Sequence, residues 1–361
     1  MTHRIVNFNA GPSTLPLDVL KIVQEEMLDY KGTGMSLMEI SHRSPEFDAV
    51  NEDAIKLTRE LLGLDDKFHV LFLGGGASTQ FAMIPMNFLT KDKCGAYVDT
   101  GTWSSKAIKE AQIVGRMHLA GSSKNEEYRR IPKQSELDVP ADAAYLHITS
   151  NNTIKGTQWH TFPDFSNVPL ICDMSSDMCS RVIDFKKFSL IYAGAQKNLG
   201  PAGVTMVIIH DDLLQKCKDG NPSMFDYRTH APKKSLYNTP PAFGIYVVKL
   251  VLEWIKNQGG LPAVEKVNRA KQELVYGVID KHPDYYKGTA DKDSRSWMNV
   301  TFRLPSEDLE KKFISEAKAA ELGGLKGHRS VGGCRASIYN AMTLEGCRKL
   351  VDFMEAFKKA N

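Results

Sequence analysis

The chain has 361 residues, of which 42% are apolar and 25% charged, and this composition excludes disordered, collagen-like and coiled-coil chains. Its 46 basic and 43 acidic side chains give a net charge of +3, which offers no reason to expect nucleic acid or a membrane surface as a partner. No apolar run reaches the roughly 18 residues of a membrane span, and the N-terminal segment lacks the apolar region of a signal peptide. The six cysteines form no C-x-x-C pair and are too sparse for a disulfide framework, so we expect reduced thiols and a cytoplasmic location.

The first two thirds of the chain predict an α/β sheet preceded by helices. Apolar residues at helical spacing predict helices over 15–30 and 45–62, the second with Ser44 as its N-cap and Gly63 as its end. Short, continuous apolar runs predict buried strands at 69–73, 96–98, 144–148, 170–172, 190–193 and 204–209. Helices between several of these strands favour a mostly parallel sheet. The connection from Ala193 to Val204 is too short for a parallel crossover, so this pair should be antiparallel within a mixed sheet.

The last third predicts a smaller α+β unit. Helices are expected over 241–256 and 261–281, followed by a strand at 297–302, a helix at 306–320, a strand at 335–338 and a helix at 343–359. We place a domain boundary near Gly259-Gly260. The large domain then spans 16–259, and the small domain comprises 1–15 and 260–361.

A triple glycine, Gly74-Gly75-Gly76, lies between an expected strand and an expected helix. The N-terminus of a helix presents unpaired N–H groups and the positive end of the dipole, which suits a phosphate. A P-loop would need Gly-Lys-Ser/Thr at its end, and a dinucleotide fingerprint would need glycine where Thr79 stands. A phosphate cup for another cofactor and a merely tight turn remain as alternatives.

Two charged residues follow apolar strands further along the chain. Asp173 comes directly after one strand, and at the carboxyl edge of a parallel sheet such a residue faces a ligand or caps a helix. Lys197 follows another strand among small and apolar residues, where poor solvation would lower its pKa and favour an amine nucleophile; a surface loop lysine is the alternative. Pyridoxal phosphate needs three groups in its binding site: a phosphate cup, an acid that faces the pyridine nitrogen and a lysine that forms an imine with the aldehyde. No histidine has metal-ligand spacing, so no metal is expected.

Nine short segments in order carry a family resemblance across essentially the whole chain: 7–12, 40–44, 74–80, 101–104, 149–154, 172–176, 195–198, 237–241 and 328–341. With them the chain resembles the phosphoserine aminotransferases, class V aminotransferases of the fold-type I pyridoxal-phosphate enzymes. The resemblance implies a mixed, mostly parallel seven-stranded sheet in the large domain and a smaller α+β C-terminal domain.

The resemblance also implies a role for each cofactor contact. Lys197 would hold the cofactor covalently and then move a proton on the substrate Cα, and Asp173 would pair with the pyridine nitrogen. Trp103 would stack on the ring and Thr153 would bond near the ring oxygen. The phosphate would be held by Ala77, Ser78 and Gln196, and by Asn238 and Thr239 from a second subunit. A homodimer with its active sites at the subunit interface follows from the resemblance.

The substrates require two separate cationic clamps, because phosphoserine carries a carboxylate and a phosphate while glutamate and 2-oxoglutarate carry two carboxylates. Arg335 is the candidate for the α-carboxylate through a bidentate fork. The resemblance places two His-Arg pairs around the distal anion: His42-Arg43 from the partner subunit and His328-Arg329. An imidazolium would be favoured beside the dianion. Either pair alone could equally be a solvated surface dipeptide.

The expected activity is reversible amino transfer between O-phospho-L-serine with 2-oxoglutarate and 3-phosphohydroxypyruvate with L-glutamate, in serine biosynthesis. In some members of the family a phosphorylated hydroxythreonine of pyridoxine biosynthesis is a further substrate. The alternatives are a related transaminase, a cysteine desulfurase, a nicotinamide dehydrogenase that uses the Gly74 loop, and a non-catalytic phosphate-binding protein. A desulfurase would need a mobile catalytic cysteine, and none of the six lies in an evident active-site loop.

Overall fold

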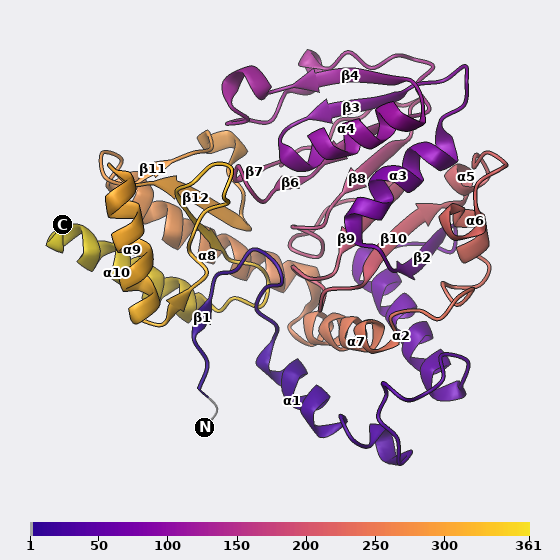
Figure 1. The fold of residues 1–361 in the computed structure, drawn as a ribbon, viewed down its shortest axis with the longest axis horizontal. Coiled ribbons are helices and arrows are strands. Elements are labelled where there is room, and N and C mark those ends of the chain that lie inside the picture. Colours follow the sequence, from indigo (N-terminus) through magenta and orange to yellow (C-terminus); the bar gives the residue numbers. More distant parts are fainter. Residues whose placement is uncertain (1–2) are drawn as a thin grey trace.

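A seven-stranded sheet lies at the centre of the larger part of the computed structural model, which describes residues 3–361 (Figure 1). Met1 and Thr2, at the start of the segment assigned to the small domain, lie outside the described residues. The strand order is β2-β10-β9-β8-β5-β3-β4. The strands are β2 (Phe68–Leu73), β3 (Gly95–Asp99), β4 (Met117–Ser122), β5 (Tyr145–Thr149), β8 (Leu170–Asp173), β9 (Leu190–Gly194) and β10 (Thr205–His210).

Strand direction confirms the mixed sheet that the sequence predicts. β10 runs antiparallel to both β2 and β9, and the other neighbouring pairs are parallel. The short loop between β9 and β10 therefore closes a hairpin. Edge strand β4 was not predicted, because its alternation of apolar and small polar residues is weaker than the continuous apolar runs of the inner strands.

Helices cover both faces of the sheet because its inner strands are apolar on both sides. In β2, Val70 and Phe72 pack with α1 (Leu17–Glu25), α2 (Pro45–Leu62) and α7 (Ala242–Asn257). Leu71 and Leu73 pack on the other face with α3 (Gly76–Phe88) and α4 (Thr102–Val114). α5 (Asp211–Leu214) and α6 (Tyr227–His230) are single turns on this second face.

The helix ends test the predicted caps. Ser44 accepts a hydrogen bond from the Phe47 amide at 3.4 Å, and Gly63 ends α2 in the left-handed region at φ 64°, as predicted. The prediction of a helix to residue 30 was wrong, since α1 ends at Glu25. Asp29 instead accepts a hydrogen bond from the Gly34 amide at 2.7 Å, and such side chain to backbone bonds favour turns over helix.

The remaining elements form a second core. The antiparallel strands β11 (Lys287–Gly288), β12 (Asn299–Arg303) and β14 (Cys334–Ser337) are covered by α9 (Glu307–Ala319), α10 (Leu344–Ala360) and the C-terminal half of α8 (Gly260–Lys281). β1 (Val6–Asn7) pairs in parallel with β13 (Leu322–Gly323), and β6 (Asn151–Asn152) pairs with β7 (Thr157–Gln158). Phe8 is fully buried in this second core, whereas Leu261 and Val264 at the start of α8 belong to the first. The division into domains near residue 260 stays a prediction.

The carboxyl ends of six strands meet at one edge of the large sheet. All strands except β10 run in the same direction, so the residues that follow them gather there. In an open α/β sheet this edge is where ligands bind. Within residues 3–361, no helix combines the length and the apolar character needed to cross a membrane.

Candidate active site

The Lys197 amine lies at the centre of this edge, three residues beyond β9. Its Nζ donates a hydrogen bond to Thr153 Oγ1 at 2.8 Å and stands 5.7 Å from the ring centroid of Trp103. Burial lowers the pKa of Lys197 to about 8, with the Arg335 charge adding to this effect and the Asp173 charge opposing it. A substantial fraction of the amine is therefore unprotonated at mildly alkaline pH, as a nucleophile or base requires.

The Asp173 carboxylate ends β8 and is 4% exposed. Its Oδ1 accepts hydrogen bonds from the Ser175 amide at 2.9 Å and the Ser175 hydroxyl at 2.6 Å. Burial raises the pKa of Asp173, while the bonds from Ser175 and the Lys197 charge act in the opposite direction. Oδ2 accepts no hydrogen bond from residues 3–361, so one oxygen is oriented by Ser175 and the other is open to a ligand. Sequence reasoning gave Ser175 no role, although the Asp-x-Ser spacing is that of an Asx turn.

The glycine loop begins α3 without a side-chain cap. Gly75 has φ 87°, and a Cβ added there would lie 2.1 Å from Thr79 Oγ1, which donates to the Gly75 carbonyl at 2.9 Å. The loop therefore needs glycine at this position. Ala77 is half-buried and Ser78 is exposed in the first turn, where the helix N–H groups have no intrahelical acceptor. This arrangement suits a phosphate group.

The segment before α1 packs directly against Lys197, which sequence reasoning missed. Ser13 donates its hydroxyl to the Lys197 carbonyl at 2.5 Å and its amide to the Gln196 carbonyl at 3.0 Å. A Cβ on Gly11 would lie 3.5 Å from Lys197 Cγ. Only the family motif at 7–12 marks this segment in the sequence, and the motif alone does not show what the segment contacts.

Arg335 on β14 brings the small core to the same site. Its Nη1 donates to the Thr153 carbonyl at 3.5 Å, so Thr153 contacts both Lys197 and Arg335. The Arg335 Nε is buried and has no hydrogen-bond partner within residues 3–361. Such an unpartnered donor is expected where an anionic ligand completes the site.

His328 and Arg329 lie on the loop between β13 and β14. Burial lowers the pKa of His328, and the cationic Arg335, Arg329 and Lys106 lower it further. His328 is therefore biased toward its neutral form in this structure, and the expected imidazolium would need the charge of an anion to favour it.

Four residues expected at the site lie apart from Lys197 in this chain. His42 accepts a hydrogen bond from the exposed Arg43 at 3.4 Å, in the loop before α2. Asn238 and Thr239 are exposed, and Asn238 Nδ2 donates to the Thr239 carbonyl at 3.1 Å. Within the described chain, none of the four forms a hydrogen bond or ion pair with the Lys197 group. The expectation that they act from a second subunit stays a prediction.

The cysteines bear on the desulfurase alternative. All six are buried and none is paired. Burial raises the pKa of Cys179 to about 12 and that of Cys347 to about 11. No cysteine thus offers the exposed, low-pKa thiol that a desulfurase nucleophile needs.

Comparison with known proteins gives the family. The model of class-V aminotransferases matches residues 5–350. A phosphoserine aminotransferase of Desulfosudis oleivorans is 59% identical over the full length of both chains. The structure of phosphoserine aminotransferase from Bacillus circulans subsp. alkalophilus is similar with a TM-score of 0.98 at 53% identity, covering 99% of each chain. That of the pyridoxal-phosphate-bound enzyme from Trichomonas vaginalis has a TM-score of 0.92 at 37% identity, covering 98% of this chain and 100% of that one. The chain belongs to the class-V aminotransferases and, within them, to the phosphoserine aminotransferases.

Proposed function

We propose that the protein transfers an amino group reversibly between O-phospho-L-serine and 2-oxoglutarate, in serine biosynthesis, with pyridoxal phosphate as its cofactor. The observation that carries this proposal is a single juxtaposition. A buried amine with a pKa of about 8, Lys197 Nζ, lies beside Thr153 and Trp103, with the buried carboxylate of Asp173 within its electrostatic influence.

The residues present fit pyridoxal phosphate. Asp173 has a free Oδ2 for a protonated pyridine nitrogen, and the ring of Trp103 can cover one face of the cofactor. The first turn of α3, at Ala77 and Ser78, offers N–H groups to the phosphate. In its site the cofactor supplies an electron sink for the pair left at the substrate Cα when the proton leaves. Asp173 would keep the ring nitrogen protonated, and a protonated ring is the better electron acceptor.

Lys197 performs the proton transfer at the substrate Cα. As a free amine its Nζ takes the Cα proton, and as an ammonium it returns a proton during the reverse half-reaction. Thr153 Oγ1 holds Nζ in place at 2.8 Å. Burial lowers the pKa of Lys197 toward the working pH, so that both protonation states are accessible in each cycle.

Arg335 would bind the α-carboxylate that all the substrates share, and its proximity to Thr153 places that carboxylate beside Lys197. His328 and Arg329 would bind the distal phosphate or carboxylate. The His42-Arg43 pair, and Asn238 with Thr239, would supply the remaining contacts when a second copy of the chain completes the site.

Absorbance and covalent labelling test the activity. The purified protein should absorb in the visible as a lysine-bound pyridoxal phosphate, and its spectrum should shift with phosphoserine far more than with serine. Borohydride reduction followed by peptide mapping should place the label on Lys197, and Lys197→Ala should abolish turnover. A label on another lysine would exclude the assignment, and equal rates with serine and phosphoserine would exclude the phosphate clamp.

Subunit mixing tests the shared site. Lys197→Ala and Arg43→Ala proteins should each be nearly inactive. Unfolding and refolding them together should restore partial activity, because a mixed dimer contains one site with both residues intact. Mixed dimers that stay inactive would place Arg43 outside the partner's site.

A further inference from the structure

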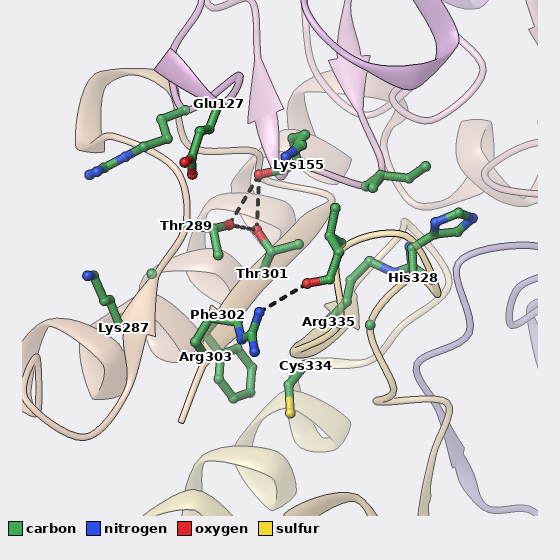
Figure 2. A pocket seen from close by; sticks show the side chains of 16 residues that line it. Glu127, Lys155, Lys287, Thr289, Thr301, Phe302, Arg303, His328, Cys334 and Arg335 are labelled. Atoms are coloured by element: carbon green, nitrogen blue, oxygen red, sulfur yellow. Dashed lines mark hydrogen bonds between the residues drawn. The ribbon is translucent and has the colours of Figure 1, made fainter. Parts of the chain in front are cut away.

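A cationic cavity of about 260 Å³ lies next to the Lys197 site and is bordered by Arg335 (Figure 2). It is enclosed by β11, β12 and β14, by the turns around Glu127 and Lys155, and by the loop that carries His328. Arg335 and His328 border it, but Lys197, Asp173 and Trp103 do not. The cavity is therefore adjacent to the proposed reaction site and separate from its reacting groups.

Strand register places cations on the cavity side of the small sheet. Lys287 is opposite Arg303, and Thr301 is opposite Arg335, so these four side chains project from one face. The other face packs into the second core through Phe302 and its neighbours. Like charges directly opposite one another on a sheet are destabilising unless a counter-charge is present.

The protein neutralises only part of this charge. Arg303 Nε is 2.5 Å from Glu310, and Arg129, on the cavity wall, is 3.0 Å from Asp291. Lys155 and Lys287 form no ion pair within residues 3–361. The Lys155 ammonium instead stands 5.7 Å above the ring of Tyr128.

The rest of the lining favours an anion as well. Glu127 is the one acidic residue among the 16 that line the cavity. The Thr289 and Thr301 hydroxyls donate to the Lys155 carbonyl at 3.3 and 3.1 Å, so they position Lys155 on the cavity wall. Arg335 contributes its Nε donor, which has no hydrogen-bond partner among the described residues. Lys155, Lys287 and Arg335 therefore outweigh Glu127.

The backbone beside the cavity is strained. Glu127 and Tyr128 are consecutive non-glycine residues in the left-handed region, with φ 55° and 62°. Tyr128 holds this turn through its hydroxyl, which donates to Asp99 Oδ2 at 2.9 Å. Strain that the fold retains is concentrated at functional sites, and here it lies in the turn that brings Glu127 to the cavity wall.

We propose that this cavity is a second binding site for a small dianion, of the phosphate or dicarboxylate class, outside the reaction site. Lys287 and Lys155 supply its charge, and Arg335 is shared with the reaction site. A dianion in the cavity draws on the Arg335 charge and so raises the KM for substrate. This kinetic consequence rests on the proposed transaminase function, whereas the binding itself does not.

Calorimetric titration of the holoenzyme with inorganic phosphate tests the binding. The wild-type protein should show two phosphate sites per chain. Lys287→Gln should weaken one of them about tenfold, the loss of one charged hydrogen bond, while Arg43→Gln weakens the other. Thr301→Val keeps the side-chain shape but removes the hydrogen bond to the Lys155 carbonyl, and through the displacement of Lys155 it should weaken the Lys287-dependent site as well. Lys349→Gln is the matched control, since Lys349 is exposed on α10 and absent from the cavity lining.

Repeating the titration with 2-oxoglutarate shows which dianion the cavity prefers, and binding of either one at the Lys287-dependent site supports the proposal. A single phosphate site, or unchanged affinity in both Lys287→Gln and Thr301→Val, would overturn it. If both variants show wild-type phosphate binding with full transaminase activity, the cavity proposal fails and the proposed function stands. If the wild-type protein binds phosphate in the cavity but has no transaminase activity, the proposed function fails and the binding proposal stands.

Discussion

Replacing the active-site lysine should stabilise the cofactor-free protein. Burial lowers the pKa of Lys197 from 10.5 to about 8, so the folded state disfavours the ammonium. Between these pH values the unfolded chain binds more protons, and stability rises with pH. Below about pH 8 both states are charged, and the folded protein bears the full penalty.

The size of the effect follows from the shift. A shift of this size corresponds to at most about 3 kcal/mol at pH 7, and the partial solvent contact of the side chain reduces it to about 2. Lys197→Met removes this penalty but also the hydrogen bond to Thr153, which contributes about 1 kcal/mol. We therefore expect a net gain of about 1 kcal/mol, or about 2 °C in Tm, at pH 7.

A second buried lysine provides the control. Burial also lowers the pKa of Lys271 to about 8, but its Nζ donates to the carbonyls of Ile338, Tyr339 and Met342 at 3.0, 2.7 and 3.0 Å. Lys271→Met removes a penalty of about 3 kcal/mol but leaves three buried acceptors without their donor, at about 2 kcal/mol each, and should destabilise the protein by roughly 3 kcal/mol. The two substitutions are chemically identical, and their effects should have opposite signs.

Thermal unfolding of the cofactor-free proteins at pH 7 and pH 10 is the assay. The Lys197→Met advantage should be present at pH 7 and vanish at pH 10, where the wild-type amine is neutral in the folded state. The reasoning is refuted if Lys197→Met is no more stable than the wild type at pH 7, or if the difference is the same at both pH values.

Three further substitutions test the site. Asp173→Asn keeps the shape but removes the charge at the ring nitrogen, and should lower kcat about 100-fold in a coupled glutamate assay while the protein still binds cofactor; an unchanged kcat would exclude the pairing. Arg335→Lys loses the bidentate fork and should raise the KM of phosphoserine and of glutamate about tenfold each, with kcat little changed; a rise for one substrate alone would exclude a shared carboxylate clamp. Gly75 has φ 87°, and the added Cβ of Gly75→Ala would lie 2.1 Å from Thr79 Oγ1, so this substitution should weaken cofactor binding in an absorbance titration. Gly74→Ala is the control, because the space around Gly74 is open and cofactor binding should not change. Equal effects of the two substitutions would argue against a phosphate cup that depends on the backbone of Gly75.

Local pattern in the sequence determined most of the secondary structure. Ser44 and Gly63 mark the ends of α2 because capping and left-handed turns depend on neighbouring residues. The short connection after Ala193 required the β9–β10 hairpin because chain length limits which strands can pair. The end of α1 was predicted wrongly because side chain to backbone bonds such as that of Asp29 favour a turn there, and edge strand β4 escaped prediction because its apolar pattern is weak.

The residues of the site were likewise predicted only in part from the sequence. Residue types and order alone pointed to Asp173, Lys197 and a phosphate cup, and the motifs pointed to the family. Only the tertiary structure decided that Ser13 lies on Lys197, 184 residues away in the chain, and that Thr153 joins Lys197 to Arg335. Sequence indicates which side chains are present. Burial and the distances between charges, which set the pKa of Lys197 and leave the cavity beyond Arg335 cationic, arise only when segments far apart in the chain pack together.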